Sequence, residues 1–157
     1  MKKILSFTLV LLLICLCTAP VFSRETTIPA NSIDVQTEIL PDGSLFIVTM
    51  TQEAGQKGPV QSVTKTKTGS LVRNGVTVWE ISLTASFDYN GTSTYCTEAS
   101  SGYTIYNSAW VLSSRSVSKS GNSAVANFTL KQYSSGVVVE TISRTLTMSC
   151  SASGTVV

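Results

Sequence analysis

The chain has 157 residues, of which 43% are hydrophobic and only 13% charged, with 11 Lys and Arg against 9 Asp and Glu and no histidine. A chain this close to neutral lacks the basic patch that binding to nucleic acid or to an anionic membrane surface requires, so neither partner is expected. The lack of histidine also excludes catalysis by a Cys–His pair.

The first 23 residues have the build of a secretory signal peptide. Two lysines precede an apolar run from Ile4 to Cys17, and Val21 and Ser23 supply the small residues of a cleavage site. The run is shorter than the roughly 20 residues that cross a bilayer. We therefore predict a signal peptide over residues 1–23 and a secreted or surface-associated protein that is free of the membrane after cleavage. The alternatives are a retained anchor and lipidation of a cysteine in the run.

Residues 24–61 form a region with weaker patterning than the rest of the chain. The letters "PDG" separate two apolar stretches and predict one hairpin. The stretch "TQEAGQKGPV" that follows is rich in glycine and polar residues, which predicts a loop. We expect this N-terminal hairpin and loop to pack on the main domain.

Residues 62–157 carry the pattern of a β-sandwich domain. From Thr77 to Tyr89 apolar and polar residues alternate, which predicts a long half-buried strand. Asn90-Gly91 predicts a tight hairpin turn, and "KSGN" and "SSG" predict two more. Strands with one apolar face must cover it, so the fold class is all-β, an antiparallel β-sandwich. An immunoglobulin-like topology, with Trp110 packed on a disulfide, is one form of it.

Cys96 and Cys150 are the two cysteines that remain after removal of the signal peptide. An exported chain with an even number of cysteines most simply pairs them, so we predict one disulfide. Two cysteines are too few for a structural zinc site, which needs four N or S ligands. No metal and no cofactor are expected, with a calcium ion at Asp34 or Asp42 as the alternative.

Four aromatic residues are the candidate binding residues: Tyr103, Tyr106, Trp110 and Tyr133. Tyr106 and Trp110 share one face of a predicted strand with Ser108, and the other two lie on neighbouring predicted strands. Flat rings beside hydroxyl groups are what a sugar-binding face needs. The alternative is that these rings belong to the core or to cross-strand pairs.

Residues 62–157 also resemble a group of small secreted proteins of Gram-positive, often gut-dwelling, bacteria with a domain of unknown function. The resemblance rests on "SVTKTKT", "VWEISLTASFDYNGTSTYC", "YNSAWVLSSRSVSKSGNSAVA" and "ISRTLTMSCSASGTV". It implies secretion, a β-rich domain and pairing of Cys96 with Cys150, and it implies no activity. Residues 24–61 fall outside it.

We therefore predict a non-enzymatic module that binds an extracellular partner, either a polysaccharide or a protein. The first alternative is a passive structural or envelope protein that assembles through strand edges. The second is a hydrolase that uses carboxylates alone, which would need two carboxyl groups about 5 to 9.5 Å apart. Glu80 with Glu98 or with Glu140 could form such a pair across strands.

Overall fold

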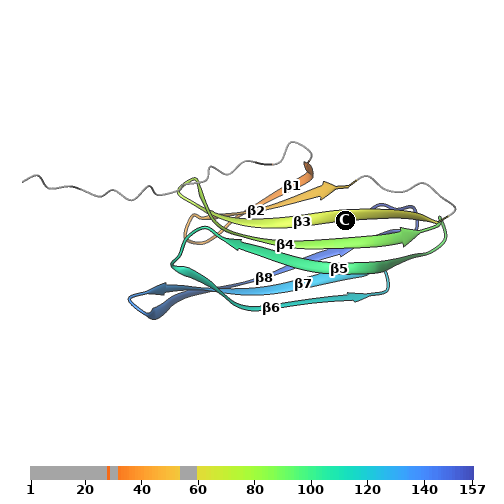
Figure 1. Cartoon of the computed structure of the whole chain (residues 1–157). Coiled ribbons are helices and arrows are strands. Elements are labelled where there is room, and N and C mark those ends of the chain that lie inside the picture. The colour runs from red at the N-terminus through yellow and green to blue at the C-terminus, as the bar shows by residue number, and fades with distance from the viewer. Residues whose placement is uncertain (1–27, 29–31, 54–59) are drawn as a thin grey trace, which may run out of the picture.

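The computed structural model describes residue 28 and residues 32–53 and 60–157, which fold into strands joined by short turns (Figure 1). Within these ranges there is no helix, and hence none long and apolar enough to cross a bilayer. The predicted signal peptide lies outside the described residues. The strands are β1 (Ser32–Ile39), β2 (Leu45–Gln52), β3 (Gln61–Arg73), β4 (Val76–Tyr89), β5 (Thr94–Ile105), β6 (Trp110–Ser120), β7 (Ser123–Ser134) and β8 (Val137–Ser149).

The strands form two antiparallel sheets that pack face to face, as the sequence predicts (Figure 1). The first sheet has the order β1-β2-β3-β4-β5 and the second the order β6-β7-β8, so within each sheet the strands follow the order of the chain. An immunoglobulin fold needs Greek-key connections that take strands out of sequential order. The immunoglobulin-like topology is therefore wrong, and the sandwich consists of two meanders.

The turns follow from residues that tolerate positive φ angles. Asn74 and Gly75 join β3 to β4 with φ of 51° and 77°, and Ser135 and Gly136 join β7 to β8 with φ of 50° and 79°. Two consecutive positive φ angles match the right-handed twist of the flanking strands, which makes these hairpins tight. The predicted "SSG" turn is thus confirmed. The tight turn predicted at Asn90-Gly91 is instead a wider loop, residues 90–93, in which Gly91 but not Asn90 has a positive φ. The Asn90 side-chain oxygen accepts hydrogen bonds from the Thr92 and Ser93 amides of this loop.

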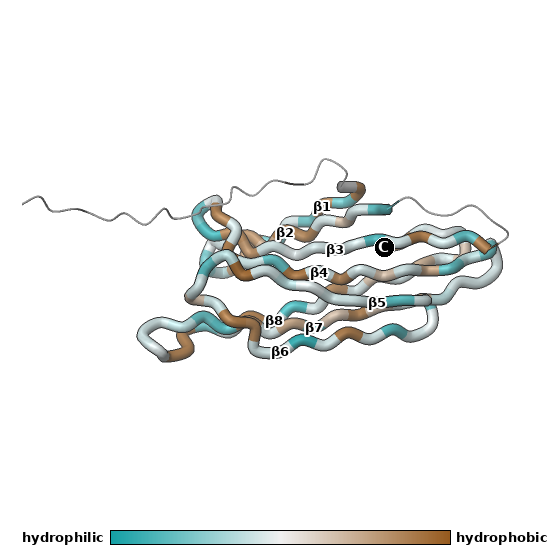
Figure 2. The backbone as a smooth tube through the Cα atoms, viewed as in Figure 1, coloured by the Kyte–Doolittle hydropathy of each residue, from teal (hydrophilic) through white to brown (hydrophobic). Residues whose placement is uncertain are grey.

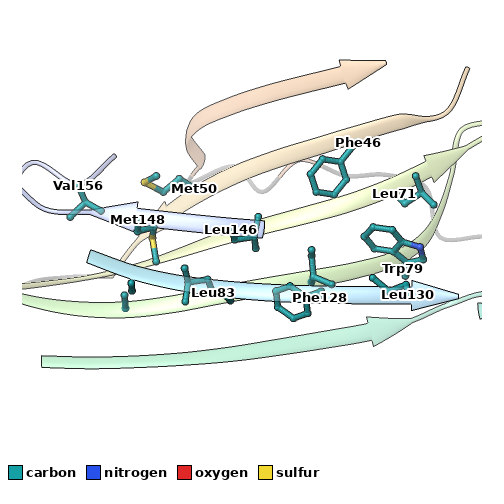
Figure 3. Close-up of a cluster of buried hydrophobic side chains, with 14 of the residues drawn as sticks. Phe46, Met50, Leu71, Trp79, Leu83, Phe128, Leu130, Leu146, Met148 and Val156 are labelled. Atoms are coloured by element: carbon teal, nitrogen blue, oxygen red, sulfur yellow. The ribbon is translucent and has the colours of Figure 1, made fainter. Parts of the chain in front are cut away.

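The core lies between the two sheets and is built by alternation along the strands (Figure 3). In β4 the odd residues from Trp79 to Phe87 are buried, whereas the even residues between them are half-buried on the outer face. Trp79 packs against Phe46 and Trp110, with ring centroids 6.0 and 6.1 Å away. Phe128 on β7 is fully buried from the other side. Burial of such aromatic side chains is a large favourable term in the stability of the sandwich.

The N-terminal hairpin belongs to the first sheet. β2 pairs with β3 from Leu45↔Val72 to Gln52↔Lys65, and its Phe46 and Met50 join the core. The predicted hairpin at "PDG" is therefore present, with β1 as the outermost strand of the sheet. Most of the predicted loop after it, residues 54–59, lies outside the described residues.

The predicted disulfide is not present, because Cys96 and Cys150 are both free and buried. Each thiol donates a hydrogen bond to a carbonyl of its own segment, that of Glu98 at 3.2 Å and that of Ser151 at 3.3 Å. The Cys96 amide donates to the carbonyl of Gly121, and the Cys150 amide donates to the carbonyl of Asn122. Both cysteines thus bond to the β6–β7 turn. Burial raises the pKa of the Cys96 thiol, which keeps it protonated and unreactive at neutral pH.

Candidate functional site

The four predicted binding residues do not form one face. Trp110 is only 3% exposed and lies in the core, edge-on to Trp79, so a ligand-facing role for it is wrong. β5 ends at Ile105 and β6 begins at Trp110, so residues 106–109 are the link between the two sheets instead of part of a strand. The alternation that put Tyr106 beside Trp110 on one face is therefore interrupted.

The three tyrosines lie in different surroundings. The Tyr106 hydroxyl donates a 2.6 Å hydrogen bond to the carboxylate of Glu80 on β4, and the ring is half-buried. Tyr103 is exposed on β5, where the Arg115 guanidinium stacks over its ring at 5.6 Å. Tyr133 is exposed near the end of β7, while its amide donates to the carbonyl of Ala109. Tyr133 is the one of the three next to other large exposed apolar residues.

Those residues form what we call the apolar hairpin tip: Tyr133, Val137, Val138 and Val139. The β7–β8 hairpin reaches past the other turns at its end of the sandwich (Figure 1), and apolar residues colour its end in Figure 2. Val137 and Val139 are 64% and 57% exposed. Because neighbouring strand residues point to opposite faces, the valines make both faces of the tip apolar.

Arg73 fastens the base of this hairpin to the rest of the molecule. It ends β3, and its Nη2 contacts both carboxylate oxygens of Glu140 on β8 at 2.8 and 2.7 Å and Asp42 at 2.9 Å. Its Nε donates to the Ser44 hydroxyl at 3.1 Å and its Nη1 to Gln132 of β7 at 3.2 Å. The guanidinium thus links the β1–β2 turn to both strands of the hairpin.

A hollow of about 340 Å³ opens beside this network. Leu40, Pro41 and Asp42 from the β1–β2 turn form one wall, and residues 140–144 of β8 form the other. The inward residue at the far end of the hollow is Arg144, which stacks over Phe46 at 4.7 Å. Arg73, Glu140 and Arg144 therefore place charged side chains beside the apolar core at this end of the sandwich.

Asp42 and Glu140 bring two carboxylates close together at the edge of the hollow, where both contact the Arg73 guanidinium. Hydrogen bonds from the Ser44 side chain and amide, with the Arg73 charge, hold the pKa of Asp42 below its ordinary value. Glu140 receives both of its bonds from a guanidinium. Glycoside hydrolysis needs one carboxyl group that stays protonated near neutral pH, which calls for a raised pKa.

Metal binding finds no support in the described ranges, where no cluster of three or more His, Cys, Asp or Glu could hold an ion. Asp42, one of the two residues considered for calcium, is engaged by Arg73 and Ser44. Asp34, the other, lies on β1 and accepts a hydrogen bond from Gln36.

Comparisons with known proteins give little further information. No family model and no curated protein matches the chain. One solved structure, a hypothetical protein from Listeria monocytogenes, is similar over 79% of this chain and 92% of its own, with 17% sequence identity and a TM-score of 0.41. Nothing about function is transferred at this level of likeness.

Neither the apolar hairpin tip nor Arg73 was predicted from the sequence. The tip had a signal, because "VVV" directly after a turn breaks the alternation that a strand with one covered face needs. No sequence pattern marked Arg73, because its partners Asp42 and Glu140 lie far from it in the chain and contact it only in the folded protein.

Proposed function

We propose that the chain is an exported, non-enzymatic binding protein that docks a partner protein through its apolar hairpin tip. The observation that carries the proposal is the exposure of Val137, Val138 and Val139 beside Tyr133 at the end of a projecting hairpin. A contiguous exposed apolar patch with a polar surround is typical of an interaction site. Export is supported by the signal-peptide pattern of residues 1–23.

The chemistry of the tip favours a protein over a polysaccharide. Aliphatic branched side chains present neither a flat ring for a sugar to stack on nor a group that bonds its hydroxyls. Tyr133 is the tip's one ring. Valine and tyrosine side chains suit the apolar centre of a protein interface, where they fill a pocket and lose contact with water.

The network at the base of the hairpin supports the same function. Arg73 bonds Gln132 and Glu140, one residue on each strand of the hairpin, and ties both to Asp42 in the other sheet. A hairpin held in this way has less conformational freedom to lose on binding. Such preorganisation raises affinity without adding any contact.

The test is a binding assay that compares two double variants of the full chain. Val137→Ser with Val139→Ser removes apolar surface from the tip, and Val111→Ser with Val117→Ser removes two exposed valines of β6 as a matched control. Wild-type chain is cross-linked in cultures of the producing cell, partners are identified by mass spectrometry, and the recombinant partner is titrated calorimetrically against each chain.

We expect the tip variant to bind the partner at least about thirtyfold more weakly, since two valine side chains lose their burial, while the β6 variant binds like wild type. Retention on insoluble peptidoglycan, cellulose, chitin, starch or mucin that Tyr133→Ala abolishes would instead make this a carbohydrate-binding protein. Equal affinities of the two double variants would overturn the role of the hairpin.

A further inference from the structure

Strand β8 forms an edge of the second sheet, and a short segment of the chain already pairs with one end of it. Ser149 and Val157 exchange two backbone hydrogen bonds of 3.0 Å, and Cys150 forms an antiparallel bridge with Val156. The side chain of Val156 is only 5% exposed and belongs to the core. Residues 155–157 thus show that the space beside β8 accepts an antiparallel strand, which can place a side chain between the sheets.

Further along β8 the same kind of backbone group is open. Because Ser149 directs its N–H and C=O away from β7, the odd-numbered residues from Thr141 to Thr147 do so as well, and their ladder to β7 is regular. Lys67 of β3 donates to the carbonyl of Thr147 at 2.8 Å, which closes the edge at that point. Residues 141–145 have no strand beside them within the described ranges. They are the stretch of this edge that is open to a further strand.

The hollow beside the Arg73 network lies next to this open stretch. Its volume of about 340 Å³ is enclosed between the β1–β2 turn and residues 140–144 of β8. Leu40 and Pro41 form an apolar wall, and Ile142 faces the hollow from β8, where its partner on β7 is buried in the core. A strand added to β8 therefore directs the side chain opposite Ile142 into the hollow.

The inward charges of β8 leave this edge open, because each of them has a partner. Glu140 contacts the Arg73 guanidinium at 2.7 Å together with Asp42, and Arg144 lies 3.5 Å from Glu38. The surroundings of the hollow thus hold three carboxylates and two guanidiniums, an excess of one negative charge. The Asp42 and Glu38 side chains are 47% and 59% exposed, so a cation that enters from solvent can reach them.

We propose that an extended segment of a partner protein pairs with residues 141–145 as an antiparallel strand and inserts a lysine or arginine side chain into the hollow. Backbone hydrogen bonds at a free edge supply affinity, and a pocket beside the edge selects the side chain. A basic side chain suits both parts of this hollow, because its aliphatic stem packs on Leu40 and Pro41 while its charged end reaches Asp42. The inference rests on the proposed function, since the apolar hairpin tip precedes this stretch on the same strand.

The test is a selection of random seven-residue peptides, displayed on phage, on the full chain with soluble Ser143→Pro chain as competitor. Ser143 presents its N–H to the free edge, so proline at this position blocks an added strand and leaves the ladder to β7 intact. Ser143→Ala is the matched control, because it also loses the side-chain bond to Thr129 but keeps the N–H. Far-ultraviolet circular dichroism checks that each variant is folded.

The selected peptides are then synthesised and titrated by fluorescence anisotropy. We expect a lysine or arginine at a shared position, equal affinities for wild type and Ser143→Ala, and binding to Ser143→Pro that is about tenfold weaker or more. Exchange of the basic residue for glutamate should weaken binding by a similar factor. Asp42→Asn, which leaves the backbone edge unchanged, should weaken binding of the basic peptide about fivefold and that of its alanine analogue hardly at all.

A selection that yields no common sequence, or peptides that bind Ser143→Pro like wild type, would overturn strand addition. Selected peptides without a shared basic residue would overturn the role of the hollow. Self-association of wild type that Ser143→Pro abolishes in sedimentation equilibrium would instead assign the edge to a second copy of the chain. The tip double variant, Val137→Ser with Val139→Ser, should bind the peptides within about twofold of wild type, so failure of the proposed function is recognised separately.

Discussion

The centre and the rim of this sandwich use the same alternating pattern in opposite ways. In β4, Ile81 and Leu83 face the second sheet, and Thr84 faces outward, where it bonds Thr66 of β3 at 2.8 Å. In β1, Val35 faces outward and Glu38 inward. Alternation alone therefore predicts only that a strand has one apolar and one polar face. Which of the two faces the second sheet depends on the tertiary packing.

The β7–β8 hairpin repeats this contrast within one pair of strands. Near the β6–β7 turn, β7 and β8 contribute Phe128, Leu146 and Met148 to the core, and near their own turn they expose the three valines of the tip. Between the two lies the Arg73 network. The difference indicates that the centre of the sandwich provides stability and that the rim carries the surfaces available to partners.

The largest expected effect is in the centre. Phe128→Ala removes a fully buried ring between the sheets and should lower the free energy of unfolding by about 3 to 5 kcal/mol. Urea denaturation measures the loss. Tyr133→Ala, on the exposed end of the same strand, is the control and should change it by less than about 0.5 kcal/mol. Similar losses in the two variants would remove the contrast between centre and rim.

Removal of Arg73 should have the next largest effect. Arg73→Met leaves Glu140 and Asp42 without their cation and should cost about 1 to 3 kcal/mol, between the values of exposed and buried ion pairs. The control is Arg115→Met, which removes an exposed cation from Tyr103. A stability equal to that of the control would mean that the network does not fasten the hairpin.

The free thiols predict a modest effect at Cys96. Because no cross-link is present, Cys96→Ala should cost about 1 kcal/mol, and a reductant should leave the stability of wild type unchanged. A disulfide closing a loop of this length would contribute about 4 kcal/mol. A loss of several kcal/mol on reduction, together with no titratable thiol in denaturant, would show that the cysteines are paired.

A smaller effect appears at acid pH. The pKa of Asp42 is lowered from 3.8 by its Ser44 hydrogen bonds and by Arg73, so its contribution to stability is present above pH 3.8 and is lost as the pH falls through the lower, folded value. Asp42→Asn removes this loss. The variant should therefore lose less stability than wild type between pH 5 and pH 2, which thermal unfolding across that range measures. Parallel curves would contradict the pKa shift.

The smallest effect on stability is expected at the tip. Val137→Ser with Val139→Ser changes two exposed residues and should alter the free energy of unfolding by less than about 0.5 kcal/mol. Denaturation of this variant beside Phe128→Ala checks the expectation. A loss of more than 1 kcal/mol would mean that the valines pack within the molecule and are not a free surface.

Local patterns in the sequence predicted most of the strands and turns. Alternation from Thr77 to Tyr89 corresponds to β4 (Val76–Tyr89), because a half-buried strand imposes a period of two on its own residues. The end of β5 at Ile105 was not predicted, since nothing in the local pattern marks where a strand passes to the other sheet. Because of this unpredicted boundary, Trp110 lies in the core and not on the predicted binding face.

The candidate site depended on contacts that no local pattern contains. Arg73 meets Asp42 and Glu140 only because β3, the β1–β2 turn and β8 converge at one end of the sandwich. The pairing of Cys96 with Cys150 was predicted from a count, whereas a disulfide depends on the distance between two sulfur atoms. The inward orientation of Glu38 on β1 also depends on tertiary contacts, because the alternation along β1 does not show which of its faces points to the second sheet.

The most direct test of the proposed function is site-specific photo-crosslinking from the hairpin tip. A photoreactive residue is placed at Val139 in one chain and at Thr145, exposed on the same face of β8, in the other. Both chains are irradiated in the producing cell, and the adducts are mapped by mass spectrometry. We expect one protein adduct from Val139, with the cross-link in an apolar groove of the partner, and none from Thr145. Equal labelling from both positions, or no protein adduct from Val139, would contradict it.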